Sequence, residues 1–263
     1  MELALPDVLK LPLLAILGLI FGSFITALSY RLPRGESVAR GRSRCGACGH
    51  TLAAMDLIPV MSWVLQHGAC RYCGVKVSWR YPAIEVICAA LFAAAGALLQ
   101  DPVQLLLLIA MTPVMLALAV VDFEHHRLPN SLVTTLAVMA LAWRWAGDHE
   151  FLTGLQTAAA AFIVCLVLDA GTRRFAGKPG LGMGDAKLLA LAGLALPIGP
   201  FLLFVMFAGV FGTLFGLIWG LLPGHQSPGM HPGQFPFAPG ILAMYWISLI
   251  YGERAINGWL ASA

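Results

Sequence analysis

The stretch LPLLAILGLIFGSFITALSYRLPR, from Leu11 to Arg34, is an apolar run that closes on two arginines, Arg31 and Arg34. About 20 such residues are enough for a helix to cross a bilayer. In a cleavable secretion signal the positive charge precedes the apolar core, whereas only Lys10 precedes this one. The stretch therefore predicts a retained transmembrane helix with its N-terminus outside and its arginines in the cytoplasm.

The rest of the 263-residue chain has the same character. Apolar residues make up 59% of it, charged residues only 11%, and the mean hydropathy is +0.83. A soluble domain of this size needs more polar surface than that. With the first block at 9–29, further apolar blocks lie at 83–100, 103–121, 131–147, 152–170, 186–199, 201–222 and 237–251. The sequence predicts an all-α polytopic membrane protein with about eight transmembrane helices, in which Pro197 and Pro200 separate the sixth block from the seventh.

Positive charge is concentrated in one loop. Eight of the sixteen Lys and Arg residues lie between Arg31 and Arg80, with only Glu36 and Asp56 as acids. The positive-inside rule places this loop in the cytoplasm, and threading the helices from it leaves only Lys10, Arg144 and Arg254 outside. The basic loops have no interleaved aromatic residues, so they indicate contact with anionic membrane lipid and no nucleic-acid partner.

The same loop carries four cysteines in two pairs, Cys45-Gly-Ala-Cys48 and Cys70-Arg-Tyr-Cys73. Two such knuckles complete a tetrahedral zinc site, and four protein ligands indicate a structural metal rather than a catalytic one. Redox-active dithiols are the alternative. We therefore expect three segments: a first transmembrane helix at 1–30, a cytoplasmic zinc-binding loop at 31–82 and a helical bundle at 83–263.

Two acids stand at the cytoplasmic edge of the predicted bundle. Asp122 lies in VDFEHHRLPN at the end of the third block, and Asp185 lies in GLGMGDAK, Gly180 to Lys187, where the sixth begins. Both connections face the cytoplasm in the charge-derived topology, so the two carboxyls can meet at one depth. A carboxyl pair that shares a proton activates water and protonates a scissile carbonyl, which is aspartyl peptide hydrolysis.

Gly182 and Gly184 flank Asp185 and are predicted to leave room for the backbone of an extended substrate. The sequence has no H-E-x-x-H pair and no G-x-S-x-G elbow, so metalloprotease and serine hydrolase chemistry are not indicated. Two other classes of function use the same features differently. A proton-coupled transporter would use the two acids as a proton relay, and a zinc-ribbon membrane adaptor would not need them.

The order of these motifs resembles the type IV prepilin peptidases, which are bifunctional leader peptidase/N-methyltransferases, over nearly the whole chain. Besides the cysteine pairs and the aspartate motifs, the matching stretches are GSFITALSYRLP (Gly22 to Pro33), DLIPVMSW (Asp56 to Trp63), SWRYPAIE (Ser78 to Glu85) and PFAPGI (Pro236 to Ile241).

The resemblance implies that Asp122 and Asp185 are the catalytic pair of a GxGD-type intramembrane aspartic protease in the bacterial inner membrane, with its active site facing the cytoplasm. It implies cleavage of the basic leader of type IV prepilins or pseudopilins after glycine. It also implies methylation of the new N-terminal residue with S-adenosylmethionine as donor. The PFAPG stretch is expected, by analogy with other GxGD proteases, to line the gap at the active site.

Three departures from the family pattern lie in the half of the chain associated with zinc and methyl transfer. Thr26 or its neighbour replaces an asparagine, the first cysteine pair lacks a proline, and Met55 stands where an aromatic residue is common. They leave the peptidase assignment intact and keep open a peptidase without methylation. No G-x-G-x-x-G marks the site of the methyl donor, and the sequence predicts neither the particular substrates nor the oligomeric state.

Overall fold

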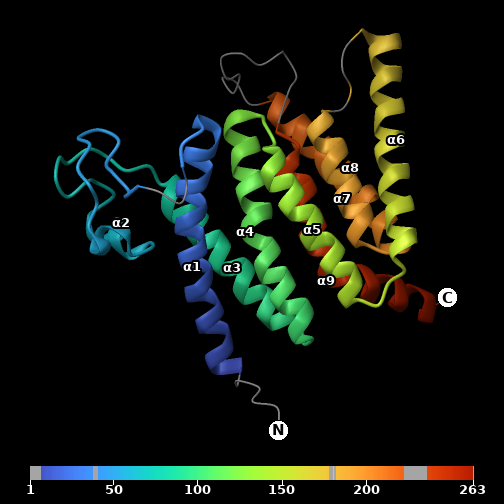
Figure 1. Cartoon of the computed structure of the whole chain (residues 1–263), viewed down its shortest axis with the longest axis horizontal. Coiled ribbons are helices and arrows are strands. Elements are labelled where there is room, and N and C mark those ends of the chain that lie inside the picture. The colour runs from blue at the N-terminus through green and yellow to red at the C-terminus, as the bar shows by residue number, and fades with distance from the viewer. Residues whose placement is uncertain (1–6, 38–40, 178–179, 181, 222–235, 263) are drawn as a thin grey trace. The chain divides into compact units, whose positions relative to one another are not determined.

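The computed structural model describes residues 7–37, 41–177, 180, 182–221 and 236–262, and this part of the chain is helical, without a named strand. Figure 1 shows the helices in chain order. They are α1 (Asp7–Arg31), η1 (Leu32–Arg34), η2 (Ala54–Leu57), α2 (Met61–Leu65), α3 (Arg80–Leu98), α4 (Pro102–His125), α5 (Asn130–Ala146), α6 (Phe151–Ala176), α7 (Met183–Ala195), α8 (Ile198–Leu221) and α9 (Ala238–Ser262).

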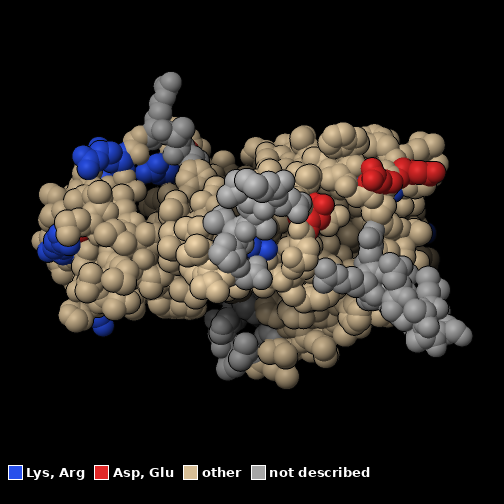
Figure 2. Space-filling view, turned by 90° about the horizontal axis from the view of Figure 1, so that it is seen from below, with Lys and Arg blue, Asp and Glu red and all other residues tan. Residues whose placement is uncertain are grey.

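The predicted all-α class is confirmed, and each predicted apolar block corresponds to one helix. Among the described residues, α1, α3, α4, α6 and α8 are long and apolar enough to cross a membrane, while the apolar part of α9, Ala238–Gly252, is shorter. The face seen in Figure 2 is made mostly of uncharged side chains. Five candidate spans are thus present, and the number eight stays a prediction.

A break in the chain separates α7 from α8, as the two prolines predict. α7 ends at Ala195 and α8 begins at Ile198, with Pro197 between them. Because α7 has 13 residues, it is about 20 Å long, which is shorter than the roughly 30 Å hydrocarbon core of a bilayer.

The chain divides into two compact units, Met1–Ala117 and Leu118–Ala263. In the first unit, α1 packs closely against α3 through glycine. A Cβ added at Gly18 would lie 2.6 Å from the Cα of Ala89, and one at Gly22 would lie 2.5 Å from the Cα of Glu85. Only glycine permits this approach of the two backbones, which is a common way for helices to associate in membranes.

In the second unit, Arg144 of α5 fixes the C-terminal end of α7. Its side chain is buried and donates to the carbonyls of Leu194 and Leu196 at 3.3 and 3.2 Å, and also to Glu150 O and Thr153 Oγ1 at 2.7 and 2.6 Å. A guanidinium at a helix C-terminus satisfies carbonyls that have no partner within the helix. The charge of Arg144, which the charge-derived topology places on the outer side of the membrane, is thus enclosed by protein.

Two further contacts hold α7 in the same unit. Lys187, in its second turn, donates to Asn130 Oδ1 of α5 at 2.8 Å. The hydroxyl of Tyr245 in α9 donates to the carbonyl of Leu191 at 3.3 Å. The helix that carries Asp185 is therefore tied to both α5 and α9.

Candidate active site and metal centre

Asp122 lies in the last turn of α4 and is 8% exposed. Its Oδ2 accepts the backbone N–H of Ala238, the first residue of α9, at 3.2 Å. A helix N-terminus presents unpaired N–H groups and a partial positive charge, both of which favour a carboxylate. The PFAPG stretch thus contacts one aspartate of the predicted pair, and its place along a gap at the active site stays a prediction.

Asp185 lies in the first turn of α7, which begins after Gly182. An acidic residue is favoured there because the helix dipole is positive at this end. The carboxyl is half-buried and turns back toward Gly182, where an added Cβ would lie 3.0 Å from its Oδ2.

The two carboxyls belong to one unit and lie within electrostatic range of each other. Two like charges in a partly buried place are not both ionised readily, so such a pair shares a proton. The protonated member can donate a hydrogen bond and the ionised member can accept a proton from water. This arrangement can perform general acid–base chemistry on a bound amide.

The two predicted substrate glycines differ in their surroundings. A Cβ at Gly184 would lie 2.7 Å from Cδ1 of Leu128, whereas Gly182 is exposed and adjacent to the carboxyl of Asp185. Internal packing therefore accounts for Gly184 and not for Gly182. Their role in substrate binding stays a prediction.

Asp169 is a further acid near the candidate site, and no motif in the sequence points to it. From α6, its Oδ1 accepts the N–H of Gly180 at 3.2 Å, and its Oδ2 accepts Nε of Arg173 at 2.8 Å. It thus holds Gly180, which lies five residues before Asp185. Only its charge near the end of an apolar block could have marked it in the sequence.

The structure brings the four predicted zinc ligands together. The sulfur atoms of Cys45, Cys48, Cys70 and Cys73 all lie within 4.8 Å of one another, and those of Cys45 and Cys73 are 3.8 Å apart. A tetrahedral site with Zn–S bonds of about 2.3 Å has sulfur–sulfur edges of about 3.8 Å. The cluster therefore fits a tetrahedral thiolate metal site.

Both cysteine pairs form the same backbone turn. The N–H of Gly49 donates to the carbonyl of Cys45, and that of Gly74 to the carbonyl of Cys70, each at 2.9 Å. Both glycines have φ of +70°, which side chains other than glycine rarely adopt. The N–H groups of Cys48 and Ala47 lower the pKa of the Cys45 thiol, which favours the thiolate form that binds a metal.

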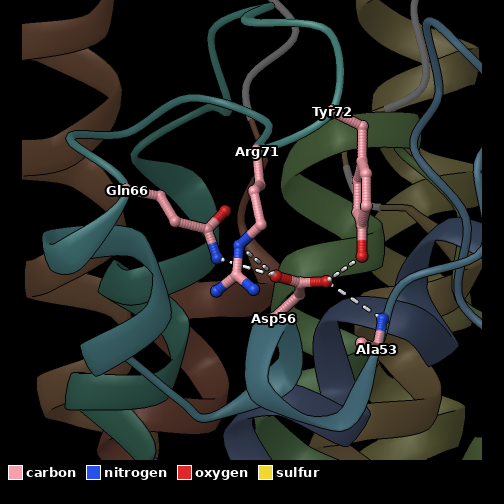
Figure 3. A network of polar contacts seen from close by, with 5 residues as sticks. All are labelled: Ala53, Asp56, Gln66, Arg71 and Tyr72. Carbon is pink, nitrogen blue, oxygen red and sulfur yellow. Dashed lines mark hydrogen bonds and ion pairs between the residues drawn. The ribbon is translucent and has the colours of Figure 1, made fainter.

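Asp56 is the centre of a polar network that supports the second pair (Figure 3). Its carboxylate accepts the N–H of Ala53 and Nε2 of Gln66 at 3.0 Å, the Tyr72 hydroxyl at 3.1 Å, and forms an ion pair with Arg71 at 3.3 Å. Burial raises the pKa of this carboxyl, but these donors outweigh burial and bring the pKa below its usual value.

The network also connects the two cysteine pairs. Arg71 and Tyr72 are the middle residues of the second pair, and the Tyr72 ring stacks on His50, just after the first, with centroids 3.7 Å apart. Asp56 is therefore a structural residue of the loop.

Comparisons with known proteins agree with these features. A model of the bacterial peptidase A24 N-terminal domain matches residues 16–98, and a model of the type IV leader peptidase family matches residues 106–217. The chain is 33% identical to a protein of Bacillus subtilis across 96% of this chain and 99% of that protein. It is 34% identical to a protein of Myxococcus xanthus, across 76% of this chain and 60% of that protein. It is 31% identical to a protein of Aeromonas hydrophila, across 84% of this chain and 75% of that protein. All three relatives are named prepilin leader peptidase/N-methyltransferase. No solved structure gives a significant match.

Replacing Asp56 with Asn should lower the free energy of unfolding of the loop at neutral pH by about 2 kcal/mol, because an amide cannot accept all the hydrogen bonds that the carboxylate accepts. Folding lowers the pKa of Asp56 below the usual carboxyl pKa of 3.8. The stabilisation from its carboxylate is therefore present above pH 3.8 and is lost as the pH falls through the lowered pKa of the folded protein. Hydrogen exchange of the loop should be faster in the variant at pH 7, and the difference from the natural protein should shrink in acid.

Glu36→Gln is the matched control, because it neutralises the other acid of the loop, which is exposed. A difference between Asp56→Asn and the natural protein that is as large in acid as at pH 7 would show that the charge of Asp56 does not stabilise the loop.

Proposed function

The chain belongs to the type IV leader peptidase family, and on that premise we propose that it is a membrane aspartic endopeptidase with N-methyltransferase activity. It cleaves the basic leader of type IV prepilins or pseudopilins after glycine on the cytoplasmic side. It then methylates the new N-terminal residue, with S-adenosylmethionine as donor. The proposal places the enzyme in the bacterial inner membrane as a multi-pass protein.

The observation that carries the peptidase proposal is that Asp122 and Asp185 lie in one compact unit, the first buried at the end of α4 and the second half-buried at the start of α7. In the proposed mechanism, the ionised carboxylate takes a proton from a water molecule as its oxygen attacks the scissile carbonyl carbon. The protonated carboxyl donates its proton to the carbonyl oxygen. The resulting tetrahedral intermediate then collapses: the carboxyl that took the proton from water donates it to the amine nitrogen as the C–N bond breaks, and the other carboxylate takes back the proton of one hydroxyl as the carbonyl reforms.

Surrounding groups keep the pair in place for this chemistry. The N–H of Ala238 holds Asp122, and the contacts of Arg144, Lys187 and Tyr245 hold the helix that carries Asp185. Preorganised groups of this kind lower the cost of reaching the transition state. The exposed position of Gly182 beside the carboxyl of Asp185 supports a role for this turn in receiving the substrate backbone.

The other two classes of function are less well supported. A proton relay does not require the chain to match peptidase families along its length, and an adaptor does not require two acids in one site. The relatives' names support cleavage together with methylation. The described residues form no β-sheet, so they offer no crevice at strand ends of the kind that binds nucleotide cofactors in α/β folds.

We further propose that the cysteine cluster binds structural zinc. When bound, zinc would join the two halves of a loop that is too small to bury a large core, and would stabilise it. The function then divides along the chain, with the first transmembrane helix at 1–30, the zinc-binding loop at 31–82 and the peptidase bundle at 83–263.

Asp122→Asn and Asp185→Asn should each reduce leader cleavage by at least about 100-fold, because each removes one partner of the acid–base pair. The double variant should be no worse than either single variant, since residues that act as a unit are not additive. Cleavage is measured with purified prepilin in detergent by the mobility shift of the product.

The control is Asp101→Asn at the other end of α4. The Asp101 side chain accepts the N–H of Gln104 at 2.7 Å, and asparagine fills this capping role equally well. Near-normal cleavage by both active-site variants would overturn the mechanism.

Zinc content should fall from one atom per chain to near none when Cys48 and Cys73 are both replaced by serine, because two of the four ligands are then absent. Elemental analysis of the purified membrane protein gives the stoichiometry. Cys165→Ser, which changes a buried cysteine outside the cluster, should retain the metal. Equal zinc in both proteins would place the metal elsewhere.

A prepilin cleaved in the presence of S-adenosylmethionine should carry one added methyl group on its new N-terminal amine. Mass analysis of the mature product measures this directly, and S-adenosylhomocysteine in place of the donor gives the control. An unmethylated product under conditions that allow cleavage would restrict the activity to that of a peptidase.

A further inference from the structure

The segment between the two cysteine pairs exposes an unusual amount of apolar surface. Six side chains of η2, α2 and the connection between them are each at least 41% exposed: Met55, Leu57, Ile58, Met61, Val64 and Leu65. Soluble surfaces rarely expose large contiguous apolar patches, and those that exist mark an interaction site. We call these six residues the apolar patch.

The patch occupies one face of α2, and the opposite face points into the loop. Met61, Val64 and Leu65 follow the i, i+3, i+4 spacing of one helix face. From the other face, Nε1 of Trp63 donates to the carbonyl of Val77 at 3.0 Å, and Gln66 donates to Asp56. The loop thus uses its polar partners internally and leaves the apolar face outward.

One contact fixes the depth of the patch relative to the first unit's transmembrane helices. The N–H of Val60, directly before α2, donates to Oε2 of Glu85 at 2.7 Å. Glu85 is buried inside the candidate span Arg80–Leu98 and packs against Gly22 of α1. Gly22 lies nine residues before Arg31, which corresponds to about 13 Å along the helix.

The aromatic residues around the ends of α1 and α3 support the same depth. Tyr30, Trp79 and Tyr81 are exposed, as is typical of side chains at the membrane–water interface. Glu85 lies one turn deeper than Tyr81 along α3. Accordingly, Figure 1 shows α2 beside α1 and α3 rather than beyond the end of α1.

Charge and continuity identify the occupant as lipid. Val86 and Ile87, which follow Glu85, are exposed apolar residues of the same candidate span, so the patch adjoins surface that lipid covers. Arg42, Arg71 and Lys76 of the loop are also exposed. Exposed apolar and basic side chains on one segment are the combination that binds an anionic bilayer surface.

We propose that the apolar patch inserts into the boundary between headgroups and acyl chains of the cytoplasmic leaflet. The zinc-binding loop is then anchored to the membrane at its middle as well as at its two ends, and the Val60–Glu85 hydrogen bond sets the depth of the insertion. The loop that the sequence predicts as a cytoplasmic segment is an interfacial one.

The test uses the full-length, zinc-loaded protein in vesicles of phosphatidylethanolamine and phosphatidylglycerol. Met61 or Leu65 is replaced by the photo-crosslinking residue p-benzoylphenylalanine, and irradiated samples are analysed by intact mass. Val164, exposed on the candidate span of α6, serves as the lipid-facing reference, and Arg44, exposed on the loop, as the water-facing one. Zinc content equal to that of the natural protein shows that each variant has a folded loop.

Lipid adducts at Met61 and Leu65 should reach at least half the yield at Val164, with no adduct at Arg44. Crosslinks to a second chain or to residues 118–263 would show that protein covers the patch, and this would overturn the proposal. Probes that react no more than the one at Arg44 would show that the patch faces water and would overturn it equally.

Discussion

The constraint on which the second unit depends is the position of a short helix that carries a carboxyl at its first turn. α7 is too short to cross a bilayer, so its ends need partners within the protein. Arg144 supplies donors to the carbonyls at one end, and Lys187 with Tyr245 holds the helix to α5 and α9. These contacts place Asp185 within reach of the charge of Asp122, which the N-terminus of α9 stabilises in turn.

In the first unit, specific contacts hold the cysteine-containing loop to the candidate transmembrane helices α1 and α3. Gly18 and Gly22 bring the backbones of α1 and α3 together, and the carboxyl of Glu85 in α3 accepts the N–H of Val60 from the loop. The loop is therefore stabilised by three kinds of interaction: the cysteine cluster, the Asp56 network and this contact with a transmembrane helix. A metal site joined to the membrane in this way has a defined position at the bilayer surface.

The sequence was sufficient for features that follow from local composition. Apolar runs marked all of the long helices, Pro197 marked the break between α7 and α8, and the spacing of the cysteines marked the cluster. Contacts between distant residues were not accessible in this way. Ala238 and Asp122 are 116 residues apart, and the burial of Arg144 depends on where α6 and α7 lie. Likewise, the contact of Leu128 with Gly184 joins residues 56 positions apart and could not be predicted from the pattern around Asp185, while the role of Gly182 and Gly184 in substrate binding stays a prediction.

The central claim is that Asp122 and Asp185 act as one proton-sharing site. The most direct measurement is the separation of their carboxyl oxygens in an experimental structure with a non-cleavable leader peptide bound. The account predicts that both carboxyls lie within about 2.6–3.2 Å of one shared water or of the atom that replaces it. Carboxyls too far apart for any single water to contact both, with the peptide bound between other groups, would contradict it.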